Sequence, residues 1–340
     1  MFPPFSLIKL DEKSPSHAKI LIMISGEISG IYLRPRDVVL LRDLFESRIM
    51  SLAHVSALHF GGKSPMAKKR VQKLKKAGLL RERPRRVSDP SVLFLTLKAF
   101  RLLHANGHVS DYPGIGEASF EKRSQVSSLT VSHELEVMDV KAAIVPAINR
   151  TSQYTVAEFS TWPVLYKFRA CRANGERAIV KPDGFVRIHE KEPDGGKYEH
   201  AFFLEVDRST ESLEVLADKA HCYVDFYRTG GFAQRFGGAT EDYKKFPFRV
   251  LVVCKTAERR KNLALRLLRN TPAITTQVWL SQLDDVTTDP LGLIWRRPAD
   301  YAEETRTMPD QILEPRVQSQ QDLLFHRLLL SVPNIDVAFD

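Results

Sequence analysis

The chain has 340 residues, of which 43% are apolar and 27% charged, so it can bury a sizeable core and is expected to form about two domains. The apolar run at residues 20–24 is too short for a signal peptide or a bilayer span, so neither is expected and no membrane partner is predicted. The three cysteines are isolated and odd in number, so they indicate neither a disulfide framework nor a zinc knuckle. We therefore expect a cytoplasmic protein in a reducing compartment.

The net charge of +9 is concentrated in one short segment. Residues 63–86 hold eleven basic residues and one acid, Glu82, so the rest of the chain is nearly neutral. A local excess of this density predicts a surface that binds a polyanion. The alternative is a solvated basic helix without a partner.

The residues around this basic segment follow the pattern of a winged helix. A helix opens at Pro35, a second follows the capping Ser51, and Gly61-Gly62 turns the chain into a third at residues 64–77 that Gly78 ends. A basic hairpin tip at residues 81–90 and a returning strand at 92–96 form the wing. Winged helices also bind proteins, but a recognition helix and a wing that are both basic favour double-stranded DNA. The expected contacts come from Lys68, Lys69, Lys73, Lys76, Arg83, Arg85 and Arg86.

The second half of the chain predicts an α/β domain with a mixed sheet and helices on its faces. Residues 105–128 lack periodicity and are expected to be a linker, and a helix follows from residue 129 to about 145, where Pro146 should end or kink it. Strands are expected at 154–159, 178–181, 248–254 and 276–280, with helices at about 209–228 and 257–268. Strands that alternate with helices imply parallel crossovers.

A hairpin inside this domain brings three carboxylates together. The turn-forming residues 192–196 separate two runs of strand formers, and a fold at about Asp194 places Asp183 opposite Glu205 and Phe185 opposite Phe203. Alternation then predicts an acidic face with Asp183, Glu205 and Asp207, and a core face with Val186, Phe202 and Leu204. The alternative is a surface hairpin whose acids only pair with nearby basic side chains.

Carboxylate oxygens are the ligands that hard divalent cations prefer, so this face predicts a site for Mg²⁺ or Mn²⁺. Asp183 and Glu205 would hold the metal, and Asp207 would be a further ligand or a partner of Lys181. Such a site could cleave phosphodiesters, because the metal stabilises developing charge and lowers the pKa of its water.

The architecture resembles the restriction-endonuclease-like superfamily, whose pattern is Pro-Asp followed by Asp/Glu-x-Lys. Residues 33–295 more closely resemble the replication-relaxation family, in which a winged helix precedes a nuclease-like domain and which includes plasmid mobilisation relaxases. The resemblance rests on His133 and Asp139, residues 182–184, residues 204–208, and Lys219 with Tyr223. It implies site-directed cutting or nicking of plasmid or mobile-element DNA, at a plasmid origin region and alongside other mobilisation or replication proteins.

One departure from the superfamily pattern bears on activity. Asp207 stands where the superfamily has its lysine; Lys219 on the following helix is the first candidate substitute and Lys181 the second. The nucleophile could be water or, as in a relaxase, Tyr223. His133 and Glu136 could approach the same site, although a capping or core histidine is the commoner role. A DNA-binding replication or regulatory protein with an inactive nuclease-like domain is the alternative function.

These expectations divide the chain into five parts. An N-terminal extension covers residues 1–33, the winged helix covers 34–104, and the linker covers 105–128. The restriction-endonuclease-like domain covers 129–297, and a C-terminal tail with a short helix at about 319–330 covers 298–340.

Overall fold

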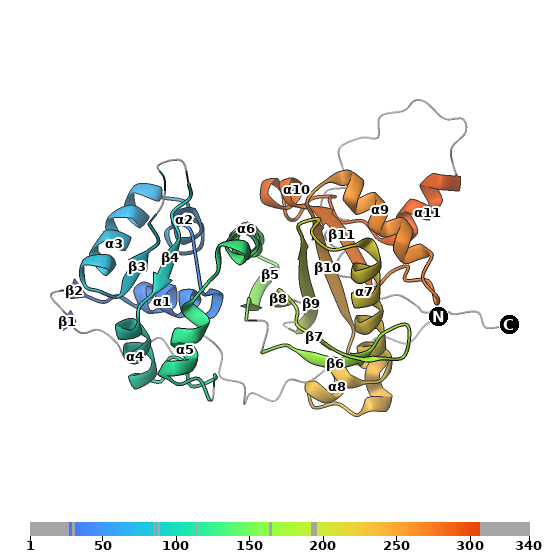
Figure 1. Cartoon of the computed structure of the whole chain (residues 1–340), viewed down its shortest axis with the longest axis horizontal. Coiled ribbons are helices and arrows are strands. Elements are labelled where there is room, and N and C mark those ends of the chain that lie inside the picture. Colours follow the sequence, from blue (N-terminus) through green and yellow to red (C-terminus); the bar gives the residue numbers. More distant parts are fainter. Residues whose placement is uncertain are drawn as a thin grey trace. The chain divides into compact units, whose positions relative to one another are not determined.

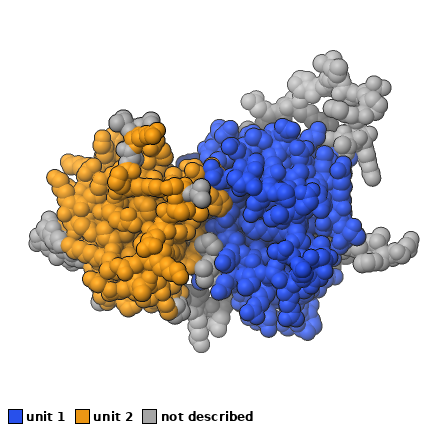
Figure 2. Space-filling model, viewed as in Figure 1, with its two compact units in different colours: residues 1–6, 147–159, 163–340 blue, residues 7–146, 160–162 orange. Residues whose placement is uncertain are grey.

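The computed structural model describes residues 27–28, 31–84, 86, 89–112, 114–162, 165–191 and 196–306 (Figure 1). The chain divides into two compact units (Figure 2). Unit 1 holds residues 1–6, 147–159 and 163–340, and unit 2 holds residues 7–146 and 160–162. None of the described helices is long and apolar enough to cross a membrane.

Unit 2 contains the winged-helix elements in the predicted order. Helices α1 (Pro35–Ser47), α2 (Leu52–Phe60) and α3 (Ser64–Lys76) precede the antiparallel pair β3 (Leu80–Glu82) and β4 (Leu93–Leu95). A short ribbon, β1 (Glu27–Ile28) with β2 (Ile31–Tyr32), comes before them. Ser51 caps α2 by accepting a hydrogen bond from the His54 amide at 3.1 Å, as its sequence predicts. The left-handed glycines Gly61 and Gly78 end α2 and follow α3, because this backbone conformation strains other residues.

The segment between the winged helix and the second domain is more ordered than its sequence indicates. After α4 (Leu97–Ala105), the predicted linker contains α5 (Glu117–Ser124), and the ring of Phe120 stacks on Phe100 with centroids 4.6 Å apart. The next helix, α6 (Ser128–Asn149), runs past Pro146. Unit 2 extends to residue 146, so most of α6 belongs with the winged helix and not with the sheet, unlike the sequence-based division at residue 128.

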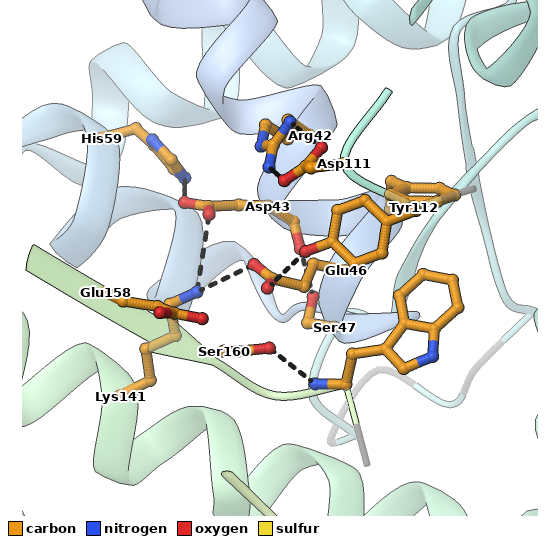
Figure 3. Close-up of polar contacts among 12 residues, drawn as sticks. Arg42, Asp43, Glu46, Ser47, His59, Asp111, Tyr112, Lys141, Glu158 and Ser160 are labelled. Carbon is orange, nitrogen blue, oxygen red and sulfur yellow. Dashed lines mark hydrogen bonds and ion pairs between the residues drawn. The ribbon is translucent and has the colours of Figure 1, made fainter. Parts of the chain in front are cut away.

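A buried polar cluster explains why α6 is part of unit 2 (Figure 3). Lys141 on α6 lies 3.4 Å from a carboxylate oxygen of Asp43 and 3.9 Å from one of Glu46, both on α1. His59 on α2 lies 3.3 Å from Asp43, and the Tyr112 hydroxyl donates to Glu46 at 2.7 Å. Burial alone would lower the pKa of Lys141, but the two carboxylates outweigh it and raise that pKa. The cluster therefore holds three helices of unit 2 together through mutually dependent charges.

Unit 1 is built on a five-stranded mixed sheet in the order β11-β10-β9-β8-β5, which confirms the predicted fold class. Its strands are β5 (Tyr154–Ser160), β8 (Gly184–Lys191), β9 (Lys197–Asp207), β10 (Phe248–Cys254) and β11 (Val278–Gln282). β8 and β9 are antiparallel, whereas β9, β10 and β11 run parallel. Parallel neighbours need crossover helices, and these are α7 (Leu213–Arg228) and α9 (Ala257–Leu268).

The core of unit 1 lies between one face of this sheet and α7 with α9. Phe185, Phe203 and Phe248 from the strands pack against Tyr223 and Phe226 of α7. Ser212 caps α7 by accepting from the Val215 amide at 3.3 Å, so this helix begins a few residues after the predicted start at about 209. The remaining elements are β6 (Phe168–Cys171), β7 (Arg177–Val180), α8 (Gly231–Arg235), η2 (Thr240–Lys245), α10 (Leu283–Thr288) and α11 (Pro298–Arg306). The helix predicted at 319–330 lies outside the described residues.

The buried cluster of unit 2 leads to a stability prediction. We expect Lys141→Met to lower the free energy of unfolding by about 3 kcal/mol, because it leaves the largely buried carboxylates of Asp43 and Glu46 without their cation. Lys122→Met, at an exposed position of α5, is the matched control and should change little. Urea unfolding of both variants measures this, and equal midpoints would contradict it.

Candidate active site

The hairpin has the register that its sequence predicts. Phe185 pairs with Phe203 and Gly184 with Leu204, and the pairing continues to Lys191 with Lys197. Residues 192–195 of the predicted turn lie outside the described residues. Asp183 directly precedes β8, where its amide donates to the Leu204 carbonyl at 3.0 Å and its carboxylate accepts from the Val206 amide at 2.8 Å. These two bonds hold Asp183 beside the strand position of Glu205.

Four sequence-predicted residues come together at this point. The Lys219 ammonium lies 2.5 Å from Glu205 Oε2, and the Tyr223 hydroxyl donates to Glu205 Oε1. Lys219 and Tyr223 share one stripe of α7 because they are four residues apart. Asp183, Glu205, Lys219 and Tyr223 are called the carboxylate–lysine cluster below. The Lys219 side chain is 28% exposed, whereas Tyr223 is 1% exposed and Glu205 6%.

The two faces of the hairpin hold the predicted residues, and Val186, Phe202 and Leu204 are buried as expected, but the acidic face is not separate from the core. Glu205 shares its face of β9 with Phe203, and that face packs against α7 in the core of unit 1. Phe202 and Leu204 on the opposite face are buried too. β9 is the middle strand of the sheet and has a parallel neighbour, and such strands are buried on both faces. The carboxylate of Glu205 therefore sits at the edge of an apolar core.

This setting raises the pKa of Glu205 to about 7. Burial is the largest cause and the nearby Asp183 carboxylate adds to it, while Lys219 and the Tyr223 hydroxyl act in the opposite direction. Burial would lower the pKa of Lys219, but Glu205 and Asp183 outweigh it and raise that pKa. Burial and then Glu205 raise the pKa of Tyr223 well above its usual value. Near neutral pH the cluster thus holds a charged lysine and a carboxyl group close to its titration midpoint.

Asp207 is not part of the cluster, in contrast to the sequence-based expectation. Its carboxylate accepts two hydrogen bonds from the Arg259 guanidinium, at 2.6 and 3.3 Å, and one from the Ser209 amide at 2.9 Å. Lys181, the other partner considered for it, is exposed. The sequence does not identify Arg259 as the partner of Asp207. Only the parallel pairing of β9 with β10 brings the first turn of α9 beside the end of β9.

A hard divalent cation would have at most two carboxylate ligands at the cluster. Within the described part of the chain, no three or more of His, Cys, Asp and Glu gather closely enough to hold a metal. Mg²⁺, however, is commonly held by one or two carboxylates, with water and substrate phosphate completing its shell. The pair Asp183 and Glu205 fits this smaller requirement, whereas the predicted triad with Asp207 does not.

The open side of the cluster is the side of Asp183 and Lys219. A cavity of about 20 Å³ beside the cluster is lined by Glu205, Lys219 and Tyr223 and by apolar residues of α7, β10, α9 and β11. It has room for about one water molecule. Asp183 and Lys219 are both partly exposed, so the cluster is open to solvent where these two side chains lie.

The basic segment in unit 2 presents the predicted surface. Ala67, Val71 and Leu74 bury one face of α3, while four lysines lie exposed on the rest: Lys68, Lys69, Lys73 and Lys76. Arg70 pairs with the buried Asp37 and is structural. Arg86 is exposed and the Arg83 guanidinium donates to Ser128 Oγ at 2.8 Å, whereas Arg85 lies outside the described residues.

The helix predicted from residue 129 to about 145 lies in unit 2, and it carries a histidine and two acids of interest. His133, Glu136 and Asp139 are on α6. Asp139 is 2.6 Å from His54 Nε2 on α2, so it has a partner within the same unit. The expected approach of His133 and Glu136 to the carboxylate–lysine cluster stays a prediction.

Comparison with known protein families identifies a match. The family model described as replication-relaxation matches residues 41–241, which is more than half of the chain. This stretch includes the basic helix α3, both strands of the hairpin and all of α7. No curated protein and no solved structure matches the chain.

The coupling between the two carboxyl groups is testable. We expect Asp183→Asn to lower the pKa of Glu205 from about 7, because it removes the neighbouring negative charge, while burial keeps that pKa above the ordinary 4.5. Carboxyl ¹³C NMR of the variant and of Glu214→Gln, a control at an exposed site of α7, measures this.

The same change alters the pH dependence of stability. The folded chain holds a proton on Glu205 that the unfolded chain loses from about pH 4.5 upward, so this group makes the free energy of unfolding fall as pH rises towards 7. Asp183→Asn should make this fall shallower in urea unfolding between pH 4.5 and 7. A Glu205 pKa that stays at about 7 in the variant would contradict the coupling.

Proposed function

Since the chain belongs to the replication-relaxation family, which indicates a DNA protein of replication or mobilisation, we propose that it is a metal-dependent DNA endonuclease or nickase. Its substrate would be double-stranded plasmid or mobile-element DNA, cut at an origin region during replication or mobilisation. The observation that carries the proposal is the contact of Lys219 with Glu205 beside Asp183. Two carboxylates and a lysine are the groups that the restriction-endonuclease-like pattern requires.

The position of Lys219 supports an active site although the usual lysine is absent from the strand. Asp207 replaces the usual strand lysine, but the ammonium of Lys219 reaches the same carboxylate, Glu205, from helix α7. The lysine is partly exposed and remains charged, because Glu205 and Asp183 raise its pKa. It can therefore orient a water molecule or stabilise a phosphate oxygen at the open side of the cluster.

The remaining groups have supporting roles in this proposal. Asp183 and Glu205 would hold one Mg²⁺ or Mn²⁺ ion, which would supply stabilisation of negative charge and a more acidic water. The Val206 amide fixes Asp183, while Lys219 and Tyr223 fix Glu205. The Arg259–Asp207 pair fixes the end of β9, which carries Glu205 two residues earlier.

The structure favours water over tyrosine as the nucleophile. Tyr223 is 1% exposed and packs against Phe168 and Phe203, with ring centroids 5.1 Å from each. A nucleophilic tyrosine has to lose its proton and reach phosphorus, and burial opposes both. We assign Tyr223 the role of positioning Glu205 through its hydrogen bond.

The basic surface of α3 would hold the DNA. Its exposed lysines would serve as the phosphate contacts of a recognition helix, together with the exposed Arg86 of the wing. Binding would be strongly dependent on salt, because each phosphate contact releases a counterion.

The cleavage assay uses supercoiled plasmid that carries the native replicon or transfer region, with Mg²⁺, Mn²⁺ or EDTA. We expect relaxed product from the wild type and a loss of at least about 100-fold in Asp183→Asn and Lys219→Met. Glu214→Gln and Lys261→Met, at exposed sites of α7 and α9, are the matched controls and should cut normally.

Two outcomes would change the proposal. DNA that is bound but never cut would favour the alternative, a DNA-binding replication or regulatory protein with an inactive nuclease-like domain. Asp207 in place of the usual lysine would then account for the lost activity. A DNA band that stays with protein until protease digestion, and that is lost in Tyr223→Phe, would restore tyrosine as the nucleophile.

The DNA-binding surface has its own test. We expect Lys69→Glu combined with Lys73→Glu to weaken binding and to reduce the slope of log affinity against log salt by about 2, because two phosphate contacts are lost. Fluorescence anisotropy between 50 and 200 mM salt measures this, with the exposed Lys122→Glu on α5 as control. An unchanged slope would place the contact surface elsewhere.

A further inference from the structure

The antiparallel ribbon of β6 and β7 in unit 1 has one strongly basic face. Arg169 pairs with Ile179 and Cys171 with Arg177, and alternation places these side chains on the outer face. Lys167 directly precedes β6 and Lys181 directly follows β7, so both extend this face at the open end of the ribbon. The basic ribbon face is defined here as Lys167, Arg169, Arg177, Ile179 and Lys181.

The opposite face of the ribbon is anchored on the helix that carries Lys219. Phe168, Ala170 and Val180 are buried in the core cluster that includes α7. Two carboxylates of α7 also bind the ribbon backbone: Asp225 accepts from the Cys171 amide at 2.7 Å and Asp218 from the Ala173 amide at 3.2 Å. Figure 1 shows the ribbon beside α7. The ribbon is therefore a fixed part of unit 1.

The cations of this face have no partner among the described residues. Lys167, Arg169, Arg177 and Lys181 are exposed, and their side chains make no ion pair or hydrogen bond within the described part of the chain. By contrast, Arg172 off this face pairs with Asp218 at 3.5 Å, and Arg187 on β8 pairs with Glu158 and Glu199. The only acid in residues 167–181 is Glu176, next to the turn. Four unpaired cations on one ribbon are suited to a polyanion.

The ribbon also leads directly into the candidate active site. Lys181 is separated from Asp183 only by Pro182, and Asp183 is held against β9 by its bonds to Leu204 and Val206. Ile179 is 60% exposed between the cations. A two-stranded ribbon fits a DNA groove, and an exposed apolar side chain amid phosphate-binding cations can contact sugars or base edges there.

We propose that the basic ribbon face binds the phosphate backbone of DNA beside the carboxylate–lysine cluster. This rests on the proposed function in that DNA is the ligand, but it does not require cleavage. Unit 1 then has its own DNA-binding surface near the cluster, in addition to the α3 surface of unit 2. The ribbon then binds the DNA phosphate backbone on the open side of the cluster, where Asp183 and Lys219 lie.

The first test measures binding of the full-length protein to a duplex from the native replicon by fluorescence anisotropy. We expect Arg169→Glu combined with Arg177→Glu to weaken binding and to reduce the salt slope by up to about 2. The matched control reverses two exposed cations of α9 and its C-cap, Lys261→Glu with Arg269→Glu, and should retain more of the slope. Both exchanges change the net charge equally, so a purely general charge effect would make them alike.

The second test locates the contact directly. A benzoylphenylalanine in place of Ile179 should crosslink to the DNA under light, whereas the same residue in place of Leu293, which is 51% exposed in unit 1, should not. Crosslinking needs no nuclease activity, so it is read out even if the cluster is inactive.

The outcomes separate this inference from the proposed function. If the wild type binds DNA but the ribbon and α9 exchanges behave alike and Ile179 gives no crosslink, the ribbon proposal is wrong and the proposed function stands. If the ribbon crosslinks but no variant or wild type ever cuts, the ribbon proposal stands and the nuclease fails. A wild type that binds no DNA overturns both.

Discussion

The contact between Lys219 and Glu205 is the interaction on which the candidate site depends. It joins the middle strand of the sheet to α7, and the same helix carries Tyr223, which binds the second oxygen of that carboxylate. Glu205 is almost fully buried, so it would be costly in this position without the lysine. α7 in turn anchors the β6–β7 ribbon through Asp218 and Asp225. Helix α7 therefore fixes the positions of both the carboxylate–lysine cluster and the basic ribbon face within unit 1.

The parallel pairing of β9 with β10 explains why neighbouring acids have different fates. Glu205 pairs with Val252 and Asp207 with Cys254, two residues nearer the carboxyl end, where the first turn of α9 begins. Asp207 therefore meets Arg259 and is fully satisfied, while Glu205 meets α7. Carboxylates two residues apart on one strand share a face, but they do not share partners when different crossover helices cover its two parts.

Local sequence signals were sufficient for the hairpin and insufficient for its surroundings. A turn between two runs of strand formers predicts the pairing of Phe185 with Phe203, and helical spacing predicts that Lys219 and Tyr223 lie on one stripe. The burial of Glu205, the Arg259 partner of Asp207 and the grouping of α6 with unit 2 follow from contacts between distant segments. Strand β6 was not predicted because its four residues, Phe168–Cys171, give too short an alternation to indicate a strand. The burial of Glu205 and its neighbours' partners depend on the order of the strands in the sheet, and no local sequence pattern contains that order.

The two buried acids at the end of β9 also differ in what they indicate about function. Asp207 accepts three hydrogen bonds from an arginine and an amide, an arrangement that a structural ion pair needs and no more. Glu205 lies beside a second carboxylate that raises its pKa, although the fold could be stabilised by an apolar residue there. A like charge next to a buried acid opposes stability and serves a site that has to bind a cation or move a proton. The unfavourable pair, Asp183 with Glu205, is therefore the stronger indication of chemistry, and the favourable pair of Asp207 with Arg259 is its support.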